Sequence, residues 1–147
     1  MTTIAWDGRT LAGDRRITAG GVVCTEWTKV LKRKDGALIG VAGEMCTGSE
    51  FQRWFMNGEK GKKPELKASV SPDECASAII VRPNGTVEAH DRDGWHVVES
   101  TQYAIGSGGN LAKVAMRCGV FADCAVEIAS EFDVYTGNKV DFVSHVS

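Results

Sequence analysis

The sequence predicts an α+β fold in which antiparallel strands form the core and helices pack on the outside. Short β-rich runs occur in blocks, and glycines or turn signals separate the runs within each block. Segments with apolar residues at three- and four-residue intervals stand between these blocks, as in amphipathic helices. Strands and helices that alternate in blocks favour antiparallel sheet with an outer layer of helices.

The first block of strands opens the chain. Its β-rich runs predict a meander of antiparallel strands, at 2–8, 10–16, 20–27 and 36–44. Phe51, Trp54 and Phe55 follow at helical spacing and predict a helix over 46–56. This helix is expected to end near Asn57, which precedes a glycine.

A polar stretch separates this helix from the second block of strands. Residues 58–74 have no hydrophobic period and carry two prolines and several lysines, so we expect a surface loop. The run 76–91 contains a turn signal at 83–86 and predicts a β-hairpin. A further strand is expected over 94–100.

The last third of the chain predicts two helices and a second hairpin. Apolar residues at helical intervals indicate helices over 110–118 and 123–132, interrupted at Gly119. The final stretch, 133–146, is expected to form a hairpin that turns at 137–138.

The composition is that of one globular domain spanning residues 1–147. A chain of this length buries roughly 70% of the surface that its unfolded form exposes. The net charge of −2 gives no electrostatic reason to expect a nucleic-acid partner. No apolar run approaches the roughly 20 residues that cross a bilayer, and the start is unlike a signal peptide, so we expect a cytoplasmic protein without a membrane partner. The five cysteines are odd in number and contain no C-x-x-C pair, so we expect them to be reduced.

Several common functional motifs are incomplete. Gly106 and Gly108 stand between a strand and a helix, but Leu111 occupies the place where the dinucleotide fingerprint needs a small residue. Ile105 replaces the first glycine of a serine nucleophile elbow. The three histidines are scattered on strand-like segments, so we expect no cofactor and no metal. The stretch 106–109 also fits a tight strand-to-helix connection that needs small residues.

The N-terminus carries a candidate nucleophile. Thr2 is small enough to permit removal of the initiator methionine, which would leave it with a free amine. An α-amino group has an unperturbed pKa of about 7.7 to 8.0, so a usable fraction at neutral pH can take a proton from the threonine hydroxyl. A nearby lysine would lower that pKa, and an aspartate would keep the lysine charged and oriented.

Four blocks of the sequence resemble, in the same order, landmarks of the proteasome β-subunit family. They lie at 2–16, 28–44, 103–115 and 127–138. The nearest resemblance is to the bacterial HslV-type branch of N-terminal-nucleophile threonine peptidases. The resemblance implies a four-layer α-β-β-α sandwich of two antiparallel sheets. It also implies a threonine-type endopeptidase that cleaves peptides or unfolded proteins and assembles into a homo-oligomeric ring.

The resemblance assigns site residues position by position. Thr2 matches the nucleophile, and its amine matches the general base. Asp14 matches the acidic partner of the catalytic lysine, and Lys29 matches that lysine. The backbone N–H of Gly40 matches the oxyanion donor, and Ser107 matches the serine that helps to move the proton of the terminal amine.

The family's later acidic residue stays open among Glu127, Glu131 and Asp133. Its second long helix has no counterpart here, because only the loop at 58–74 occupies that place, so the chain resembles a reduced variant. In the family this helical layer faces partner rings, which leaves open whether an ATPase unfoldase docks. Two alternatives remain: a catalytically degenerate assembly or interaction protein, and a non-proteolytic amidohydrolase.

The two late helices are more apolar than one buried stripe requires. The apolar positions are Leu111, Val114, Ala115, Val120, Phe121, Ala125, Val126 and Ile128. We expect this surplus surface to be covered in a homo-oligomer larger than a dimer. The alternative is a monomer in which the loop at 58–72 covers it.

Overall fold

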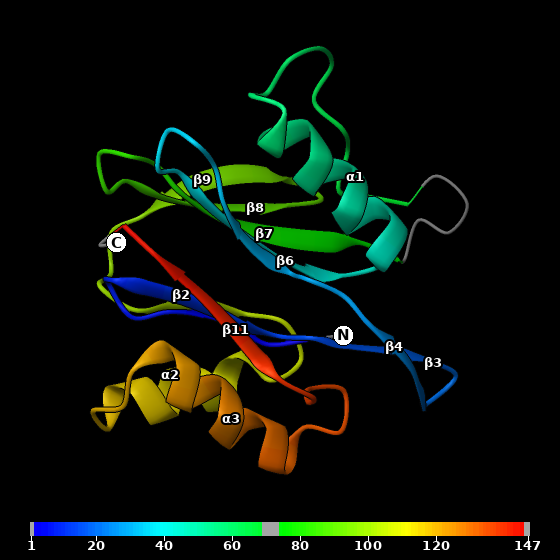
Figure 1. Ribbon diagram of the computed structural model, residues 1–147, viewed down its shortest axis with the longest axis vertical. Coiled ribbons are helices and arrows are strands. Elements are labelled where there is room, and N and C mark those ends of the chain that lie inside the picture. The colour runs from blue at the N-terminus through cyan, green and yellow to red at the C-terminus, as the bar shows by residue number, and fades with distance from the viewer. Residues whose placement is uncertain (1, 69–73, 146–147) are drawn as a thin grey trace.

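The computed structural model describes residues 2–68 and 74–145. Two antiparallel sheets face each other, and helices cover both outer faces (Figure 1). This is the four-layer α-β-β-α arrangement that the sequence predicts.

The first sheet has four strands in the order β10-β1-β2-β11. Their bounds are Ile4–Trp6 for β1, Thr10–Asp14 for β2, Tyr103–Ile105 for β10 and Val140–Ser144 for β11. The strand that begins two residues after Thr2 therefore lies in the middle of this sheet.

The second sheet has five strands in the order β5-β6-β7-β8-β9. Their bounds are Val30–Lys32 for β5, Leu38–Gly43 for β6, Ala76–Val81 for β7, Val87–Asp91 for β8 and Gly94–Val98 for β9. From β6 to β9 each strand pairs with the next one along the chain, so the predicted hairpin over 76–91 is confirmed.

The main core lies between the two sheets. Ile4, Trp6 and Leu11 of the first sheet pack against Val30, Leu38, Ile79, Val81 and Val87 of the second. Glycines allow the sheets to approach closely here. A Cβ atom on Gly13 would stand 2.7 Å from Ile4 Cδ1, and one on Gly40 would stand 2.6 Å from Ile4 Cγ2.

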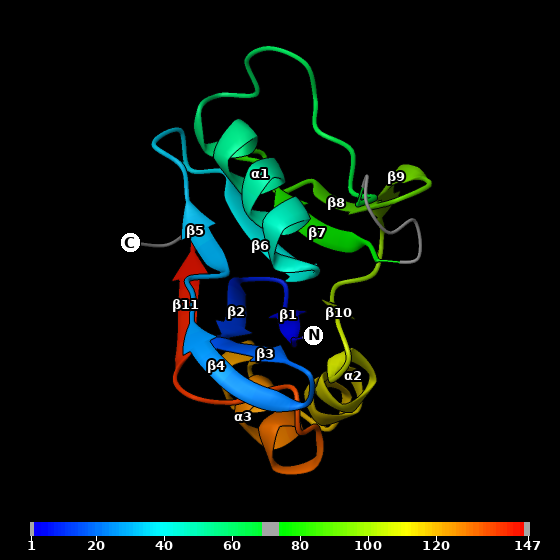
Figure 2. The same cartoon turned by 90° about the vertical axis from the view of Figure 1, so that its right-hand side faces the viewer.

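The helices cover the outer faces. Helix α1 (Met45–Met56) packs Phe51 and Phe55 on the second sheet, against a cluster that includes Ile39 and Ile80. Helices α2 (Gly109–Arg117) and α3 (Ala122–Phe132) pack on the first sheet through mostly small residues. Figure 2 shows α1 and the α2–α3 pair at opposite ends of the stack of layers.

Three features of the strand prediction are wrong. The four opening runs do not form one meander, because the first two pair in the first sheet, whereas the run 36–44 belongs to the second sheet, beside the unpredicted strand β5. The run 10–16 is broken at Arg15, so that β3 (Arg16–Ala19) leaves the first sheet and pairs with β4 (Val22–Glu26) in a separate hairpin. The hairpin predicted over 133–146 does not form in the described part of that stretch, which ends at residue 145. Residues before β11 form a turn, which Arg16 holds through hydrogen bonds to Asn138 Oδ1 (3.0 Å) and the Val134 carbonyl (3.0 Å), while β11 pairs with β2.

The described residues between α1 and β7 form turns and one isolated β-bridge, without a second helix. The predicted loop is therefore confirmed for 58–68 and for residue 74, and its remaining residues lie outside the described part. Within the described ranges, no helix is both long and apolar enough to span a bilayer.

Candidate active site

Three of the predicted site residues meet at the start of the first sheet. The hydroxyl of Thr2 donates a hydrogen bond to Asp14 Oδ1 and accepts one from Lys29 Nζ. Lys29 Nζ lies 3.0 Å from Asp14 Oδ1. All three residues are buried, with exposed fractions of 1% for Thr2, 1% for Asp14 and 3% for Lys29. The chain thus brings a hydroxyl, an amine and a carboxylate into direct contact.

Asp14 is the structural centre of this group. Besides Lys29 and Thr2, it accepts hydrogen bonds from the backbone N–H groups of Thr3, Arg16 and Gly137, each at 3.1 Å. These donors come from three separate segments of the chain. The chain leaves the first sheet at Arg15, between β2 and β3. This break places the Arg16 N–H within hydrogen-bond distance of the Asp14 carboxylate.

Opposing effects act on the pKa of Lys29. Burial is the largest and lowers its pKa below the usual value, Asp14 acts in the opposite direction, and Arg16 lowers the pKa further. Lys29 Nζ also donates to the Arg16 carbonyl (2.7 Å), so each of its three N–H groups has an acceptor. The Lys29 amine is therefore held next to the Thr2 oxygen, and its lowered pKa means that it releases a proton more readily than an exposed lysine does.

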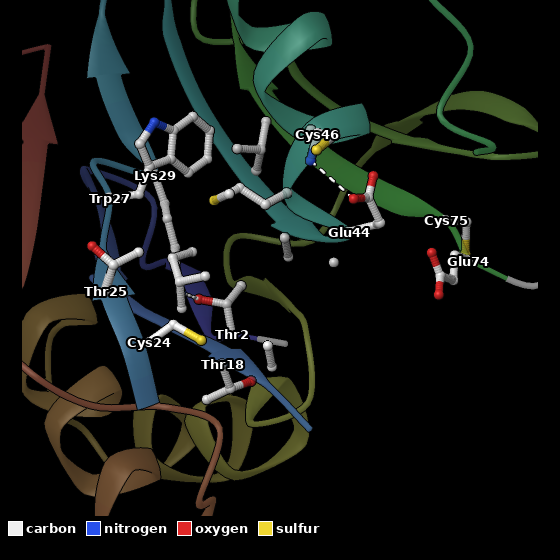
Figure 3. A pocket seen from close by; sticks show the side chains of 17 residues that line it. Thr2, Thr18, Cys24, Thr25, Trp27, Lys29, Glu44, Cys46, Glu74 and Cys75 are labelled. Atoms are coloured by element: carbon white, nitrogen blue, oxygen red, sulfur yellow. Dashed lines mark hydrogen bonds between the residues drawn. The ribbon is translucent and has the colours of Figure 1, made fainter. Parts of the chain in front are cut away.

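A pocket of about 690 Å³ opens onto Thr2 and Lys29 (Figure 3). One wall comes from the β3–β4 hairpin, with Ile17 and Cys24, and the opposite wall comes from the end of β6 and the start of α1. The lining is mostly apolar, including Trp27 and Val41. A pocket of this size and character suits a side chain of a peptide or a small organic group.

Gly40 does not reach this pocket. It lies inside β6, opposite Val30 on one side and Ile79 on the other. Gly43, three residues later, does line the pocket.

The hydrogen-bond pattern explains this difference. The backbone N–H of Glu44 donates to the Cys75 carbonyl (3.1 Å), toward β7. The backbone N–H of Val41 donates to the Lys29 carbonyl (3.0 Å), on the opposite side of β6. Because bonded and non-bonded pairs alternate along an antiparallel ladder, the N–H of Gly40 points to β7 and that of Gly43 points away from it, on the side of Lys29. The N–H of Gly43 therefore faces the pocket side of β6, whereas the N–H of Gly40 is directed to β7.

Gly43 also has a conformation that requires glycine. Its φ of +100° lies in the left-handed region, and a Cβ atom would stand 2.5 Å from the Cys75 carbonyl oxygen.

Ser107 lies on the other side of Thr2. Its hydroxyl stands 3.4 Å from the Thr2 carbonyl oxygen and 2.6 Å from Asp133 Oδ2. Asp133 also accepts a hydrogen bond from Thr136 Oγ1 (2.6 Å), which in turn contacts Thr3 Oγ1 at 2.7 Å. Among the three acidic candidates, Asp133 is thus the one at the site.

Burial raises the pKa of Asp133, but the hydrogen bonds from Ser107 and Thr136 outweigh it, so the net pKa is lowered. The carboxylate form is therefore favoured. Sequence reasoning did not single out Thr136, although it lies within the last block of the resemblance.

The glycine-rich turn at 106–109 fits against this site. A Cβ atom on Gly106 would stand 2.0 Å from the Thr2 carbonyl oxygen, and one on Gly108 would stand 2.0 Å from Thr3 Oγ1. The turn is the tight connection between β10 and α2, so its glycines serve close packing against the N-terminal strand.

Replacement of Asp14 by Ala is expected to lower the free energy of unfolding by about 3 kcal/mol or more, because it leaves a buried ammonium unpaired. Chemical denaturation measures the loss. Asp141→Ala is the matched control: its partner Arg15 is a quarter exposed, and such a pair contributes at most about 1 kcal/mol. Equal losses in the two variants would contradict the structural role of Asp14.

No protein-family model matches the sequence. Several solved structures share its fold. Eukaryotic HslV from Trypanosoma brucei superposes with a TM-score of 0.71 and 24% identity over 97% of both chains.

BPH from Thiobacillus denitrificans gives a TM-score of 0.66 and 18% identity over 97% of this chain and 95% of that one. The structure of its complex with epoxomicin gives a TM-score of 0.70 and 19% identity over 97% of this chain and 96% of that one. At this identity the likenesses show the fold, and they confirm the predicted fold class. A shortened form of that fold stays a prediction.

Proposed function

We propose that the protein is an N-terminal threonine hydrolase, a peptidase that cleaves peptide bonds through an acyl-enzyme on Thr2. The observation that carries this proposal is the contact of the Thr2 hydroxyl with Lys29 and Asp14 at the base of an apolar pocket. The shared fold with HslV, and with BPH in complex with epoxomicin, supports it.

Removal of Met1 is the first requirement, because it frees the amine of Thr2. The amine then takes the proton of the Thr2 hydroxyl, and the oxygen attacks the carbonyl carbon of the peptide bond. Lys29, held by Asp14, stabilises negative charge on that oxygen through its direct hydrogen bond. The proton passes to the leaving amine, and water later hydrolyses the ester on Thr2.

Three further residues support these steps. The N–H of Gly43 is aimed at the pocket and donates to the oxyanion of the tetrahedral intermediate. Ser107 helps to move the proton of the terminal amine, as the resemblance implies, and its hydrogen bond to Asp133 and its contact with the Thr2 carbonyl oxygen keep it next to Thr2.

The substrates are peptides or unfolded protein segments, and the expected setting is the cytoplasm. The test is hydrolysis of short fluorogenic peptides with apolar residues, in the absence of nucleotide. Measurable turnover that an epoxyketone abolishes would support the proposal. An absence of turnover over a broad peptide library would favour a degenerate assembly protein.

A homo-oligomeric ring accompanies this function. Several large apolar side chains on α2 and α3 and in the segments directly before and after α3 are exposed: Leu111, Val114, Phe121, Phe132 and Val134. Among the apolar positions that the sequence predicts on these helices, Ala115, Ala125 and Val126 are buried. The described loop residues after α1 lie on the opposite side of the molecule, so they do not cover this surface (Figure 1).

Light scattering is expected to give a mass several times the 15.8 kDa of one chain. Phe121→Glu together with Val134→Glu should lower that mass, because it places charge on the exposed apolar surface. A mass near one chain for the parent protein across micromolar concentrations would refute assembly.

A further inference from the structure

Lys29 stands on a short connection between two strands and belongs to neither of them. Residues 27–29 join the end of β4 to the start of β5. Near one end of this connection, the Trp27 N–H donates to the Arg15 carbonyl (2.9 Å). At the other end, the Val41 N–H donates to the Lys29 carbonyl (3.0 Å). The position of the Lys29 ammonium group therefore depends on what else holds this connection.

A buried side chain of α1 reaches the connection. Gln52 has an exposed fraction of 5%, and its Nε2 atom lies 3.2 Å from the Thr28 carbonyl oxygen and 3.4 Å from the Lys29 carbonyl oxygen. The amide NH₂ group has two hydrogens, so it can donate to both oxygens. Within the described ranges, no other side chain donates a hydrogen bond to either carbonyl. The amide thus joins α1 to the two carbonyls that flank the Lys29 backbone.

The same helix also forms part of the pocket. Met45 and Cys46 in its first turn line the cavity in front of Thr2, and Gln52 follows Met45 by about two turns. Figure 2 shows α1 across β6, with β5 beside that strand. Helix α1 is therefore a common support for the pocket wall and for the backbone of Lys29.

Packing alone does not require an amide at this position. Phe51 and Phe55 of the same helix fill the space against the second sheet with apolar side chains. A buried amide has an unfavourable desolvation free energy unless it is hydrogen-bonded. The partners of Gln52 are the backbone units next to Lys29, which indicates a role in placing that residue.

We propose that Gln52 is a positioning residue, which holds the Lys29 ammonium group against the Thr2 hydroxyl through the backbone of residues 28–29. Without its donors, the connection moves, and Lys29 Nζ loses part of its contact with the Thr2 hydroxyl, Asp14 and the Arg16 carbonyl. The effect on the reaction rate rests on the proposed function, whereas the effect on Lys29 itself does not.

The first test measures Lys29 directly. Gln52→Met removes both donors and keeps an unbranched side chain that suits a helix, and circular dichroism checks its fold. NMR titration of protein with ¹³C-labelled lysine gives the pKa of Lys29, whose signal is the one missing in Lys29→Ala. We expect this pKa to rise by about 0.5 or more in Gln52→Met, because a displaced ammonium group is less buried and burial is the main cause of its lowered pKa.

The second test measures catalysis with a fluorogenic peptide. We expect Gln52→Met to lower kcat by about tenfold or more, because a small misplacement of a catalytic group has effects of this size. KM should stay within about twofold of the parent value, since the residues that line the pocket are unchanged. A residue that only stabilised the fold would leave both kcat and the pKa of Lys29 near their parent values in the folded variant.

Two further variants complete the design. Gln52→Leu also lacks the donors without adding charge, so it should reproduce both effects and serves if Gln52→Met does not fold. Arg53→Met is the matched control, because it places the same residue one position further along α1, on the exposed side of the helix. In this control, kcat and the pKa of Lys29 should stay near those of the parent.

The outcomes separate the positioning role from the proposed function. An unchanged Lys29 pKa and kcat in folded Gln52→Met would overturn the inference, as would a failure of both Gln52 variants to fold, which would make the residue a structural one. If the parent protein cleaves no peptide, but the Lys29 pKa rises in Gln52→Met and not in Arg53→Met, the proposed function fails and the positioning role stands.

Discussion

Thr2→Ala is expected to reduce peptide hydrolysis to background while the protein stays folded. The substitution removes the only hydroxyl that contacts both Lys29 and Asp14 within the described residues. Alanine is as readily exposed by methionine removal as threonine, so the terminal amine is retained and only the nucleophile is lost. Initial rates with a fluorogenic peptide, together with circular dichroism, test this.

Thr2→Ser is the matched control. It keeps both the hydroxyl and the amine and loses one methyl group, so partial activity is expected. Full activity in Thr2→Ala would exclude the proposed mechanism, because the acyl-enzyme could not form on residue 2.

Lys29→Ala is expected to lower the hydrolysis rate by about two orders of magnitude or more, the range that general acid–base groups contribute. The variant removes the hydrogen bond to the Thr2 hydroxyl and leaves Asp14 with its backbone donors. The pH dependence of the rate should change as well, since Lys29 has a pKa lowered by burial and lies against the reacting oxygen.

Lys32→Ala provides the comparison on the same strand. Lys32 is exposed at the end of β5, so its loss should leave rate and pH profile near those of the parent. An unchanged rate and pH profile in Lys29→Ala would show that the role given to this lysine is wrong.

Much of the fold follows from local patterns. The helical spacing of Phe51 and Phe55 predicted α1, and both side chains are fully buried against the second sheet. The turn signal at 83–86 predicted the β7–β8 pair. Hydrophobic spacing is a local property, and these elements need only local sequence to be recognised.

The errors arise where hydrogen bonds to side chains decide. β2 ends at Asp14, whose carboxylate accepts a hydrogen bond from the backbone N–H of Arg16 two residues further on. Likewise, the turn before β11 follows from Arg16, which is more than 100 residues away in the chain. These hydrogen bonds do not affect the spacing of apolar residues, so the hydrophobic pattern does not predict them.

The site residues, too, divide into those that the sequence predicts and those that only the structure distinguishes. The resemblance to the proteasome β-subunit family predicts Thr2, Asp14 and Lys29 as site residues, and the structure brings them into contact. The segment 40–43 offers two glycines, and only the alternation of the β6 ladder shows which N–H faces the pocket. Asp133 was one of three acidic candidates, and its contact with Ser107 distinguishes it.

Intact mass of the purified protein, before and after exposure to an epoxyketone such as epoxomicin, tests the central claim most directly. The account predicts a starting mass without Met1 and the addition of one inhibitor molecule per chain, since the amine and the hydroxyl of Thr2 both react with this class of compound. Thr2→Ala should show the same loss of Met1 and no adduct. A protein that retains Met1, or one that loses it and takes up no inhibitor, would contradict the assignment of Thr2 as an N-terminal nucleophile.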